Sequence, residues 1–331
     1  MRHKLSVVMA LFNTLPYLKK CAESILSQSF EDFELIVVDN LSDDGSYEYM
    51  KTLADKDRRI ILHQRAKHGN AATSREIGRQ LAEGQFLTYV DSDDSIRPGM
   101  YDRLMGCVSD TGADIAVCNF NMVFPDRILE NYCRMEDEVL DLSAGYEPYF
   151  FRNFCASPPN NYLWSRVIRR ELYDGRGITV PDVEISEDTI FTMLCTSVAR
   201  RVAHISDSYY DYYQREDSAV RELVRNDNVV LRYVQAFEKV VSMVTSLGLE
   251  DLFRRILPFY AYTRVRSIIF YKGLVRNGSA HHDSCIRETI QGSSLPQYLR
   301  MALDGDCLMS YAEIHGNAAA EEIRKVIQQC L

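Results

Sequence analysis

Phe86-Leu87-Thr88-Tyr89-Val90-Asp91-Ser92-Asp93-Asp94 is the stretch that decides the fold. It opens as a short apolar run rich in aromatic and β-branched residues, which predicts a buried strand. The run ends on three acidic residues in four positions, and open α/β sheets bind ligands outside the carboxyl ends of their strands. Three carboxylates held close together repel one another, so this position favours a cation, and their oxygens suit Mg²⁺ or Mn²⁺. The alternative interpretation is a strand followed by an acidic, solvated turn.

Strands and helices alternate on both sides of this stretch, over residues 5–120. The alternation predicts an α/β fold with a doubly wound, mostly parallel central sheet and flanking helices. Asp39 ends the second expected strand, so Asp39 and the Asp91/Asp93 pair should face one crevice. The other expected strands cover 5–11, 33–38, 60–63 and 115–120, and the expected helices begin near Pro16, Ser46, Ala71 and Pro98.

The alternation weakens after residue 120. Residues 121–143 read as a loop or hairpin and 145–154 as a short aromatic helix, and from about 226 the pattern is helical. We therefore expect two domains, an α/β domain over 1–222 and a helical extension over 223–331.

Composition excludes several classes of protein. The 331 residues carry a net charge of −9, which argues against nucleic acid as the main partner. Nine cysteines without a C-x-x-C pair fit reduced thiols and a cytoplasmic protein. The apolar run 5–12 is followed by no small-x-small cleavage site, so we expect a buried first strand rather than a signal peptide. No run of eighteen apolar residues predicts a membrane span.

Residues 252–282 reverse the sign of the chain's charge. Basic and aromatic side chains alternate there and no acidic residue occurs. This mixture suits peripheral contact with a membrane surface, at the inner face of the cell membrane. A core helix with a solvated basic face and a homo-oligomer contact are the alternatives.

Five blocks in order resemble the family 2 glycosyltransferases, which have the GT-A fold. Residues 5–13 resemble the first strand, and 37–46 resemble the block usually written V-D-D-G-S-T-D-G-S. Residues 74–78 fall where the family has A-R-N-x-G, 86–98 match D-S-D-D-x-x-x-P, and 187–191 match E-D-x-x-F. Residues 164–170 and 213–218 resemble two further stretches of the bacterial capsule and surface-polysaccharide branch. The likeness covers roughly residues 4–220.

The resemblance implies a nucleotide-sugar donor, with uridine as the favoured nucleoside, and it implies where that donor would bind. It places Asp39 on the uracil ring and Phe12 near the base, although core packing is the alternative for Phe12. It puts Arg75 beside Asp39 or the donor phosphates, and Arg215 on the diphosphate unless it pairs with Glu216 or Asp217. The donor-binding residues that it implies are Ala10, Phe12, Asn13, Asp39, Arg75, Asp91, Ser92 and Arg215.

The same resemblance implies the chemistry of transfer. It assigns the divalent cation, Mn²⁺ or Mg²⁺, to Asp93 with Asp91, and the catalytic base to Asp188. The acceptor hydroxyl needs such a carboxylate within hydrogen-bond reach. Glu187 and Trp164 would line the acceptor and sugar subsite. First-turn helix chemistry is the alternative for the Glu187-Asp188 pair, and core packing is the alternative for Trp164.

Three departures from the family pattern affect the nucleotide contacts. Ala10 stands for the usual Pro, and Phe12 for the usual Tyr. Asn40-Leu41 stands for Asp-Gly, and Glu76 for the Asn of A-R-N. The positions implied for the metal and the base are unchanged.

We therefore expect an inverting glycosyltransferase that transfers a hexosyl or N-acetylhexosaminyl group from a nucleotide-diphosphate donor to a saccharide or lipid-linked acceptor. A phosphotransferase of the haloacid dehalogenase kind would need its D-x-D on the first strand, whereas here it is on the fourth. A non-catalytic nucleotide-sugar-binding or scaffold protein with the same fold is the remaining alternative.

Overall fold

The computed structural model describes residues 3–154, 160–215, 229–274, 289–303, 312 and 317–330. By its internal contacts the chain forms two compact units. The first comprises 1–144 and 160–215, and the second comprises 145–159 and 216–331. The assignment of catalysis to 1–222 and of an extension to 223–331 stays a prediction.

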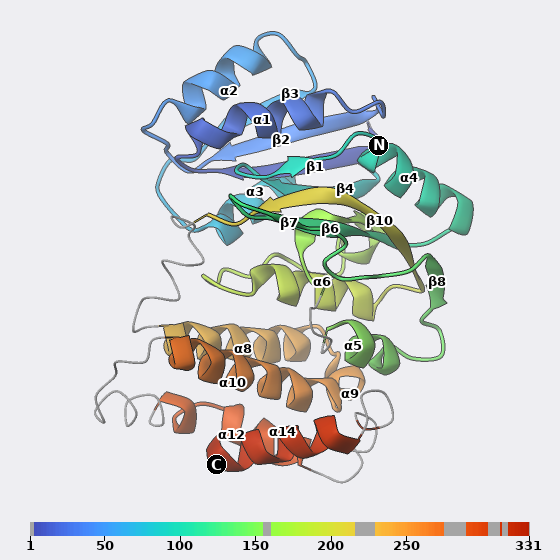
Figure 1. The fold of residues 1–331 in the computed structure, drawn as a ribbon, viewed down its shortest axis with the longest axis vertical. Coiled ribbons are helices and arrows are strands. Elements are labelled where there is room, and N and C mark those ends of the chain that lie inside the picture. The colour runs from blue at the N-terminus through green and yellow to red at the C-terminus, as the bar shows by residue number, and fades with distance from the viewer. Residues whose placement is uncertain are drawn as a thin grey trace. The chain divides into compact units, whose positions relative to one another are not determined.

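A ten-stranded sheet forms the centre of the first unit, in the order β3-β2-β1-β4-β9-β6-β10-β5, with β7 on β6 and β8 on β10 (Figure 1). The long pairings of β1 with β2 and β4, of β2 with β3, and of β6 with β10 are parallel. This arrangement confirms the predicted fold class. The strands are β1 Leu5–Leu11, β2 Phe33–Asp39, β3 Ile60–Gln64, β4 Phe86–Asp91, β5 Ser95–Ile96, β6 Ile115–Val123, β7 Ile128–Leu129, β8 Glu138–Asp141, β9 Arg166–Arg169 and β10 Arg201–Tyr213.

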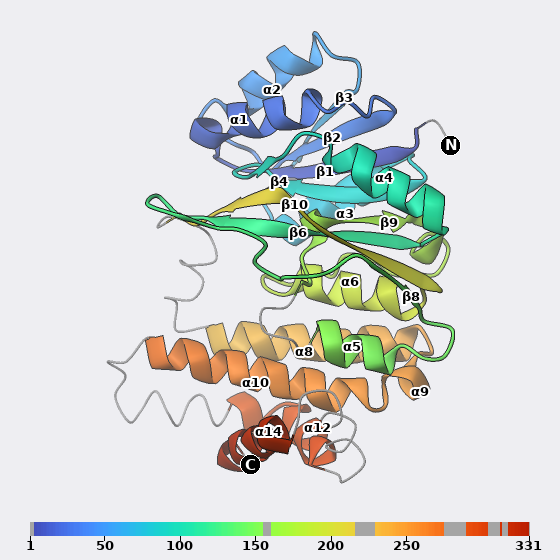
Figure 2. The ribbon, with the colours of Figure 1, turned by 45° about the vertical axis from the view of Figure 1, so that its right-hand side comes forward.

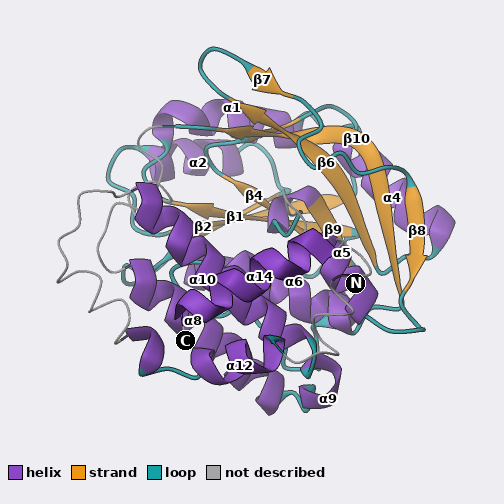
Figure 3. Ribbon diagram, turned by 60° about the horizontal axis from the view of Figure 1, so that its bottom comes forward, coloured by secondary structure: helices purple, strands orange, loops and turns teal. Residues whose placement is uncertain are grey.

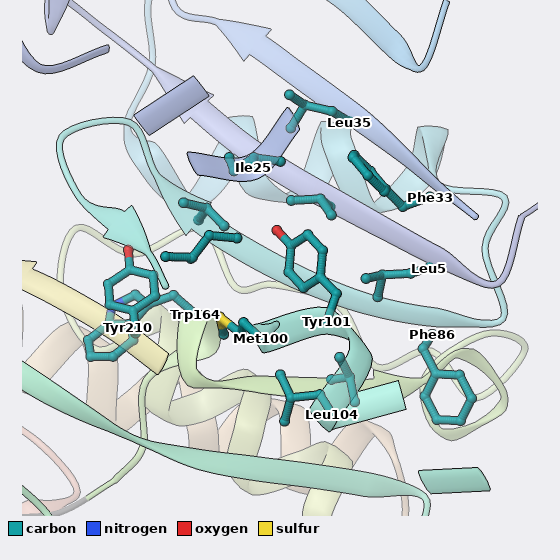
Figure 4. Packing of buried hydrophobic residues seen from close by; sticks show 14 of the residues in the cluster. Leu5, Ile25, Phe33, Leu35, Phe86, Met100, Tyr101, Leu104, Trp164 and Tyr210 are labelled. Carbon is teal, nitrogen blue, oxygen red and sulfur yellow. The ribbon is translucent and has the colours of Figure 1, made fainter. Parts of the chain in front are cut away.

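Helices cover both faces of this sheet (Figure 2). Alternate residues of β1, such as Leu5 and Met9, belong to a core shared with α1 and α4 (Figure 4). Val8 faces the opposite way, against α3, where a Cβ on Gly78 would lie 2.3 Å from Val8 Cγ1. Glycine is therefore needed at this position for the close approach of helix and strand. The helices of the unit are α1 Leu15–Leu26, α2 Ser46–Ala54, α3 Ala71–Leu81, α4 Met100–Thr111 and α6 Glu187–Ser197.

Two strands have no counterpart among the predicted elements. β9 lies antiparallel between β4 and β6, and β10 pairs along almost the whole of β6. The register of β10 shifts between Ile205 and Ser208 and again before Tyr210. These irregularities fall at polar residues and break the apolar alternation that would have indicated a strand.

Every described element of the second unit is a helix (Figure 3). The aromatic helix expected at 145–154 is α5, and its Phe151 ring lies 4.7 Å from that of Phe259 on α10. Arg255 pairs with Glu147 at the start of α5 at 3.3 Å. The helices are α5 Glu147–Asn153, α8 Val229–Ser246, α9 Glu250–Phe253, α10 Ile256–Leu274, α12 Leu295–Ala302 and α14 Asn317–Cys330.

The basic and aromatic tract at 252–282 belongs to this helical unit. Four of its aromatic residues, Phe253, Phe259, Tyr260 and Tyr262, are buried. These four act as core residues in this structure, while the side chains of 268–274 and all of 275–282 lie outside the described part of the chain. None of the helices in the described part of the chain is long and apolar enough to cross a bilayer.

Candidate active site

The carboxyl ends of β2, β1 and β4 meet at one edge of the sheet. Ala10 of β1 lies in register with Asp91 of β4, and the next residue, Leu11, lies in register with Asp39 of β2. The end of β1 is thus flanked by Asp39 on one side and by Asp91 on the other. This places the two acidic positions at one crevice, as the alternation of elements predicts.

The three carboxylates after β4 have different environments. Asp91 accepts a hydrogen bond from Arg75 Nη2 at 2.5 Å, and Asp93 is paired with the guanidinium of Arg215. Asp94 is 2% exposed and accepts from Tyr210 Oη at 2.8 Å and from the Tyr213 backbone N–H at 2.9 Å. Burial and the nearby charges of Asp93 and Asp91 hold the pKa of Asp94 well above its usual range. Asp94 therefore holds β10 against the end of β4, and the ligand roles of Asp91 and Asp93 stay predictions.

Arg75 joins the end of β4 to the beginning of α6. One guanidinium nitrogen binds Asp91 and the other binds Glu187. Burial alone would lower the pKa of Arg75, but the carboxylates of Asp91 and Glu187 raise it. Burial also disfavours the charged form of Glu187 and raises its pKa to about 7, although the charge of Arg75 acts to lower it. The bridge brings the D-S-D-D and E-D motifs to one place.

Asp188 lies beside this bridge, in the first turn of α6. Its Oδ1 accepts from the Thr189 backbone N–H at 2.7 Å. The preceding residue, Ser186, has a φ of +64° and caps the helix in the left-handed region. Strained non-glycine conformations of this kind cluster at functional sites. The side chain is half-buried, a setting that suits a proton acceptor at the rim of a crevice.

Arg215 closes the other side of the acidic pair. Its guanidinium is bound to Asp93 and lies over the Tyr17 ring, with Cζ 4.3 Å from the ring centroid. Burial and the charge of Asp91 raise the pKa of Asp93, and Arg215 lowers it. Glu216 and Asp217, the alternative partners of Arg215, lie outside the described residues.

The donor atoms at this edge fit a hard divalent cation. Asp91 and Asp93 supply carboxylate oxygens, and Mg²⁺ is often held by one or two carboxylates together with substrate phosphates. Within the described segments, no group of three or more His, Cys, Asp or Glu side chains is arranged to hold a metal ion. The residues therefore fit a cation whose remaining ligands come from a bound diphosphate.

Hydrogen bonds between two loops shape the side of the crevice next to β1 and β2. Asn13 Nδ2 donates to Asp43 Oδ1 at 2.8 Å, and the Asp43 N–H donates back to Asn13 Oδ1 at 3.0 Å. Phe12 is 48% exposed and meets His68 edge to face at 5.7 Å. Leu41, which stands for the family's Gly, has a φ of +64°. The turn thus keeps the backbone shape that glycine would adopt freely.

Asp39 lies at the bottom of this side. It is fully buried and accepts from the Ser42 N–H at 3.2 Å and from Gln64 Nε2 at 3.1 Å. Ser92 is also buried and accepts from Thr14 Oγ1 at 2.9 Å. Both residues therefore hold the loops in this structure, and their contact with a donor stays a prediction.

Arg65 is a further residue of this side that the motifs do not indicate. It follows β3 directly, and its backbone N–H donates to the Asp39 carbonyl at 2.9 Å. Its side chain donates to Thr73 Oγ1 at 2.6 Å and to Ser74 Oγ at 3.2 Å. The available signal is position alone, since a residue after a parallel strand faces the ligand edge.

Glu76, the third departure from the family pattern, has a clear role. Its carboxylate binds Arg79 at 2.7 Å and accepts from the Val180 backbone N–H at 2.9 Å. It therefore fastens the segment before α6 to α3.

Trp164 lies in the core. It is 4% exposed, and its ring stacks on Tyr210 at 4.1 Å and on Tyr162 at 4.6 Å. A ring covered in this way has little surface to offer a sugar, so the structure favours the core-packing alternative for this residue.

The comparisons with known proteins agree with this geometry. The sequence model of glycosyl transferase family 2 matches residues 6–177. This match spans more than half of the chain, so the chain belongs to glycosyl transferase family 2. It is thus a glycosyltransferase.

Its relatives are bacterial. The chain is 27% identical over 247 residues to the uncharacterized glycosyltransferase YibD of Escherichia coli, which covers 74% of this chain and 71% of that protein. It is 29% identical over 232 residues to the glycosyltransferase GlyG of Streptococcus pneumoniae, covering 67% and 74%. The crystal structure of S. aureus TarS in complex with UDP has a TM-score of 0.69 at 18% identity and covers 98% of this chain and 90% of that one. This likeness supports the GT-A fold.

Proposed function

We propose that the chain is a metal-dependent, inverting glycosyltransferase that moves a hexosyl or N-acetylhexosaminyl group from a UDP-linked donor to a hydroxyl of a saccharide or lipid-linked glycan. We further propose that it acts in the biosynthesis of bacterial surface polysaccharide or glycoconjugate. A relative named for minor teichoic acid biosynthesis, GgaB of Bacillus subtilis, supports this setting.

One observation carries the proposal. Arg75 binds Asp91 and Glu187 at once, so the end of β4 and the first turn of α6, which carries the proposed base Asp188, lie on either side of one guanidinium. Displacement needs the donor diphosphate and the acceptor on opposite faces of the anomeric carbon. The placement of Asp91 on one side of Arg75, and of Asp188 beside Glu187 on the other, supports that arrangement.

Each residue then has a defined task. Asp188 accepts the proton of the acceptor hydroxyl as that oxygen attacks the anomeric carbon. Arg75 keeps Asp91 and Glu187 in place, and Arg215 exchanges Asp93 for the donor diphosphate, which it binds by charge-assisted hydrogen bonds. Attack opposite the leaving group inverts the anomeric carbon. A divalent cation held by Asp91, Asp93 and the diphosphate would supply Lewis-acid stabilisation of the leaving group.

The donor base is proposed to lie between Phe12 and Asp39. The exposed Phe12 ring suits stacking on a planar base, and Asp39 is an acceptor suited to the uracil N–H. TarS binds UDP and UDP-GlcNAc in its crystal structures, which supports uridine as the nucleoside. Because nucleotide-sugar chemistry and free thiols fit the interior of the cell, we place the protein in the cytoplasm. Contact with the membrane or with a second copy has no support from the described part of 252–282.

The first experiment is a donor panel. UDP-glucose, UDP-galactose, UDP-GlcNAc, UDP-GalNAc, one GDP-sugar and one dTDP-sugar are each incubated with the protein, and released nucleotide is followed with Mn²⁺ and with EDTA. We expect metal-dependent release from one UDP-sugar. Equal release of nucleotide with Mn²⁺ and with EDTA would contradict the proposed metal dependence. Release from the GDP-sugar or dTDP-sugar alone would contradict uridine as the donor nucleoside.

The non-catalytic alternative makes a different prediction in the same assay. A binding or scaffold protein would bind a UDP-sugar by calorimetry and release no nucleotide. If the protein is an enzyme, Asp93→Asn should lose nucleotide release. Asp174→Asn is the exposed control, because Asp174 pairs with Arg170 at the surface.

A further inference from the structure

An aromatic cluster lies between the base helix and the acidic end of β4. Trp164 forms its centre, with Tyr210 stacked at 4.1 Å and Tyr162 stacked at 4.6 Å. Tyr212 lies 5.5 Å from Trp164 and 6.2 Å from Tyr162, inclined to the latter by 46°. Trp164 and Tyr210 lie against each other in the core (Figure 4). The cluster thus has an inner pair and an outer pair.

The two pairs differ in exposure. Trp164 and Tyr210 are buried, at 4% and 0% exposed, whereas Tyr162 and Tyr212 are half-buried. The inner pair is thus closed off in the core, whereas the outer pair keeps part of its surface exposed while it rests on the inner pair. The two outer rings are inclined to each other by 46°.

Tyr162 is fastened to the helix that carries Asp188. Thr192 Oγ1 on α6 lies 3.1 Å from the Asn161 carbonyl and 2.8 Å from the Asp188 carbonyl, and can donate to either. Arg166 Nε donates to the Tyr162 carbonyl at 2.8 Å. Burial, the neighbouring Tyr212 and the charge of Asp188 together raise the pKa of Tyr162. Tyr162 is thus tied, through the neighbouring Asn161, to the first turn of the helix that carries the proposed base.

Tyr212 is fastened to the acidic end of β4. Its neighbour Tyr213 donates its backbone N–H to Asp94, and Tyr210, two residues earlier on β10, donates its hydroxyl to the same carboxylate. Burial and the charges of Asp94 and Asp91 raise the pKa of Tyr212. The outer pair therefore spans the distance between the base and the leaving-group end.

We infer that Tyr162 and Tyr212 bind the acceptor, with the apolar face of a pyranose ring stacked on the two tyrosines so that one of its hydroxyls reaches Asp188. The inference rests on the proposed function and names the acceptor class. The ring C–H face of a pyranose suits an aromatic surface, whereas an open-chain polyol phosphate has no such face. Trp164 supports the two rings and does not touch the sugar.

The chain carries its own reporter for this contact. Trp164 is its single tryptophan, and it stacks directly on Tyr162. Binding of a sugar to the outer pair should therefore change the tryptophan fluorescence. The probes are methyl glucopyranoside, methyl galactopyranoside and methyl N-acetylglucosaminide, with glycerol phosphate as the open-chain comparison, each titrated in the presence of UDP and Mn²⁺.

We expect a saturable change with at least one pyranoside and none with glycerol phosphate. Tyr162→Ala and Tyr212→Ala should each weaken binding of that pyranoside by about tenfold and raise its KM as an acceptor by the same factor. Release of nucleotide without acceptor should change much less. Tyr162→Phe and Tyr212→Phe keep the ring and should bind within about threefold of the native protein. Tyr49→Ala is the matched control, because Tyr49 is a partly buried tyrosine of the same core on α2.

The outcomes separate the two proposals. Metal-dependent nucleotide release together with an unchanged pyranoside KM in both alanine variants overturns the acceptor inference alone. Saturation by glycerol phosphate with no response to any pyranoside overturns it as well. Absence of nucleotide release with every donor overturns the proposed function and, with it, the inference. Thermal melts identify an alanine variant that fails to fold, and in that case the titrations of the native protein with the pyranosides and with glycerol phosphate still give the test.

Discussion

The crevice has two sides that are held together by different forces. The polar side consists of loops 12–15 and 40–46, and the aromatic side consists of Tyr162, Trp164, Tyr210 and Tyr212. On the polar side Asn13 and Asp43 exchange two hydrogen bonds, and the Leu15 N–H donates to Asp44 at 2.9 Å. On the aromatic side the contacts are ring on ring, from 4.1 to 6.2 Å.

The contrast between hydrogen bonds on one side and ring contacts on the other indicates how the protein selects its donor and its acceptor. A hydrogen bond weakens steeply when its angle or length changes, so the polar side accepts one arrangement of loops and one ligand shape. Stacked rings tolerate sliding and tilting at small cost. We therefore expect a strict donor and a more tolerant acceptor, and the following predictions test that division from the largest effect to the smallest.

Asp188→Asn should reduce transfer by about a thousandfold, because a positioned base contributes roughly a hundredfold to ten-thousandfold. The asparagine can still accept from the Thr189 N–H, so the helix start should keep its shape. Initial rates with the best donor and acceptor give the measurement. The affinity for UDP, measured by calorimetry, reports on the polar side. If Asp188→Asn also lost affinity for UDP, the two sides would not act independently.

Arg75→Gln should lower the free energy of unfolding by about 3–5 kcal/mol, since it leaves two carboxylates without their shared buried cation. Denaturant titration measures the effect. Arg254→Gln is the control, because that arginine forms an exposed pair with Asp251 and should cost less than about 1 kcal/mol. An equal cost in both variants would show that the bridge between β4 and α6 carries no special stability.

Stability should fall as the pH rises towards 7 because of Glu187. Its pKa is raised to about 7 from an ordinary value of 4.5, so the native state holds this proton more tightly than the unfolded chain. Its stabilising effect is complete below pH 4.5 and is lost as the pH passes about 7. We therefore compare the melting temperature of Glu187→Gln with that of the native protein at each pH. The variant's melting temperature, relative to the native protein, should be higher at pH 8 than at pH 5. Glu171 is exposed, so Glu171→Gln should differ from the native protein by the same melting temperature at both pH values. If Glu187→Gln also showed no dependence on pH, the raised pKa of Glu187 would be contradicted.

Leu41→Gly should stabilise the polar side by up to about 1 kcal/mol, because a non-glycine residue at a φ of +64° bears a steric cost. Leu41→Ala keeps the β-carbon and should show no such gain. Chemical denaturation of both variants gives the comparison. A gain in the alanine variant instead would mean that the leucine side chain, rather than the backbone, is the source of the cost.

The sequence predicts the polar side and the acidic edge well, for a physical reason. Each of those residues lies at the end of its own strand, so the alternation of strands and helices is enough to bring Asp39 and Asp91 together. The aromatic side depends on β9 and β10, whose pairing joins distant segments and whose pattern is interrupted at Ser206 to Ser208. Trp164 therefore reads as a sugar-binding residue in the sequence, and only the stacking of Tyr210 and Tyr162 on it shows that it is a core residue.

The position of α5 has a consequence for synthesis on the ribosome. This helix precedes residues 160–215 of the first unit in the chain, yet it belongs to the second unit, where its Phe151 packs against Phe259. As the chain emerges, the helix must wait for more than a hundred residues until α10 is made. Until then the aromatic face of α5 is exposed and can associate with other nascent chains. A gene shortened to end near residue 222 should therefore yield protein that aggregates rather than a smaller active enzyme.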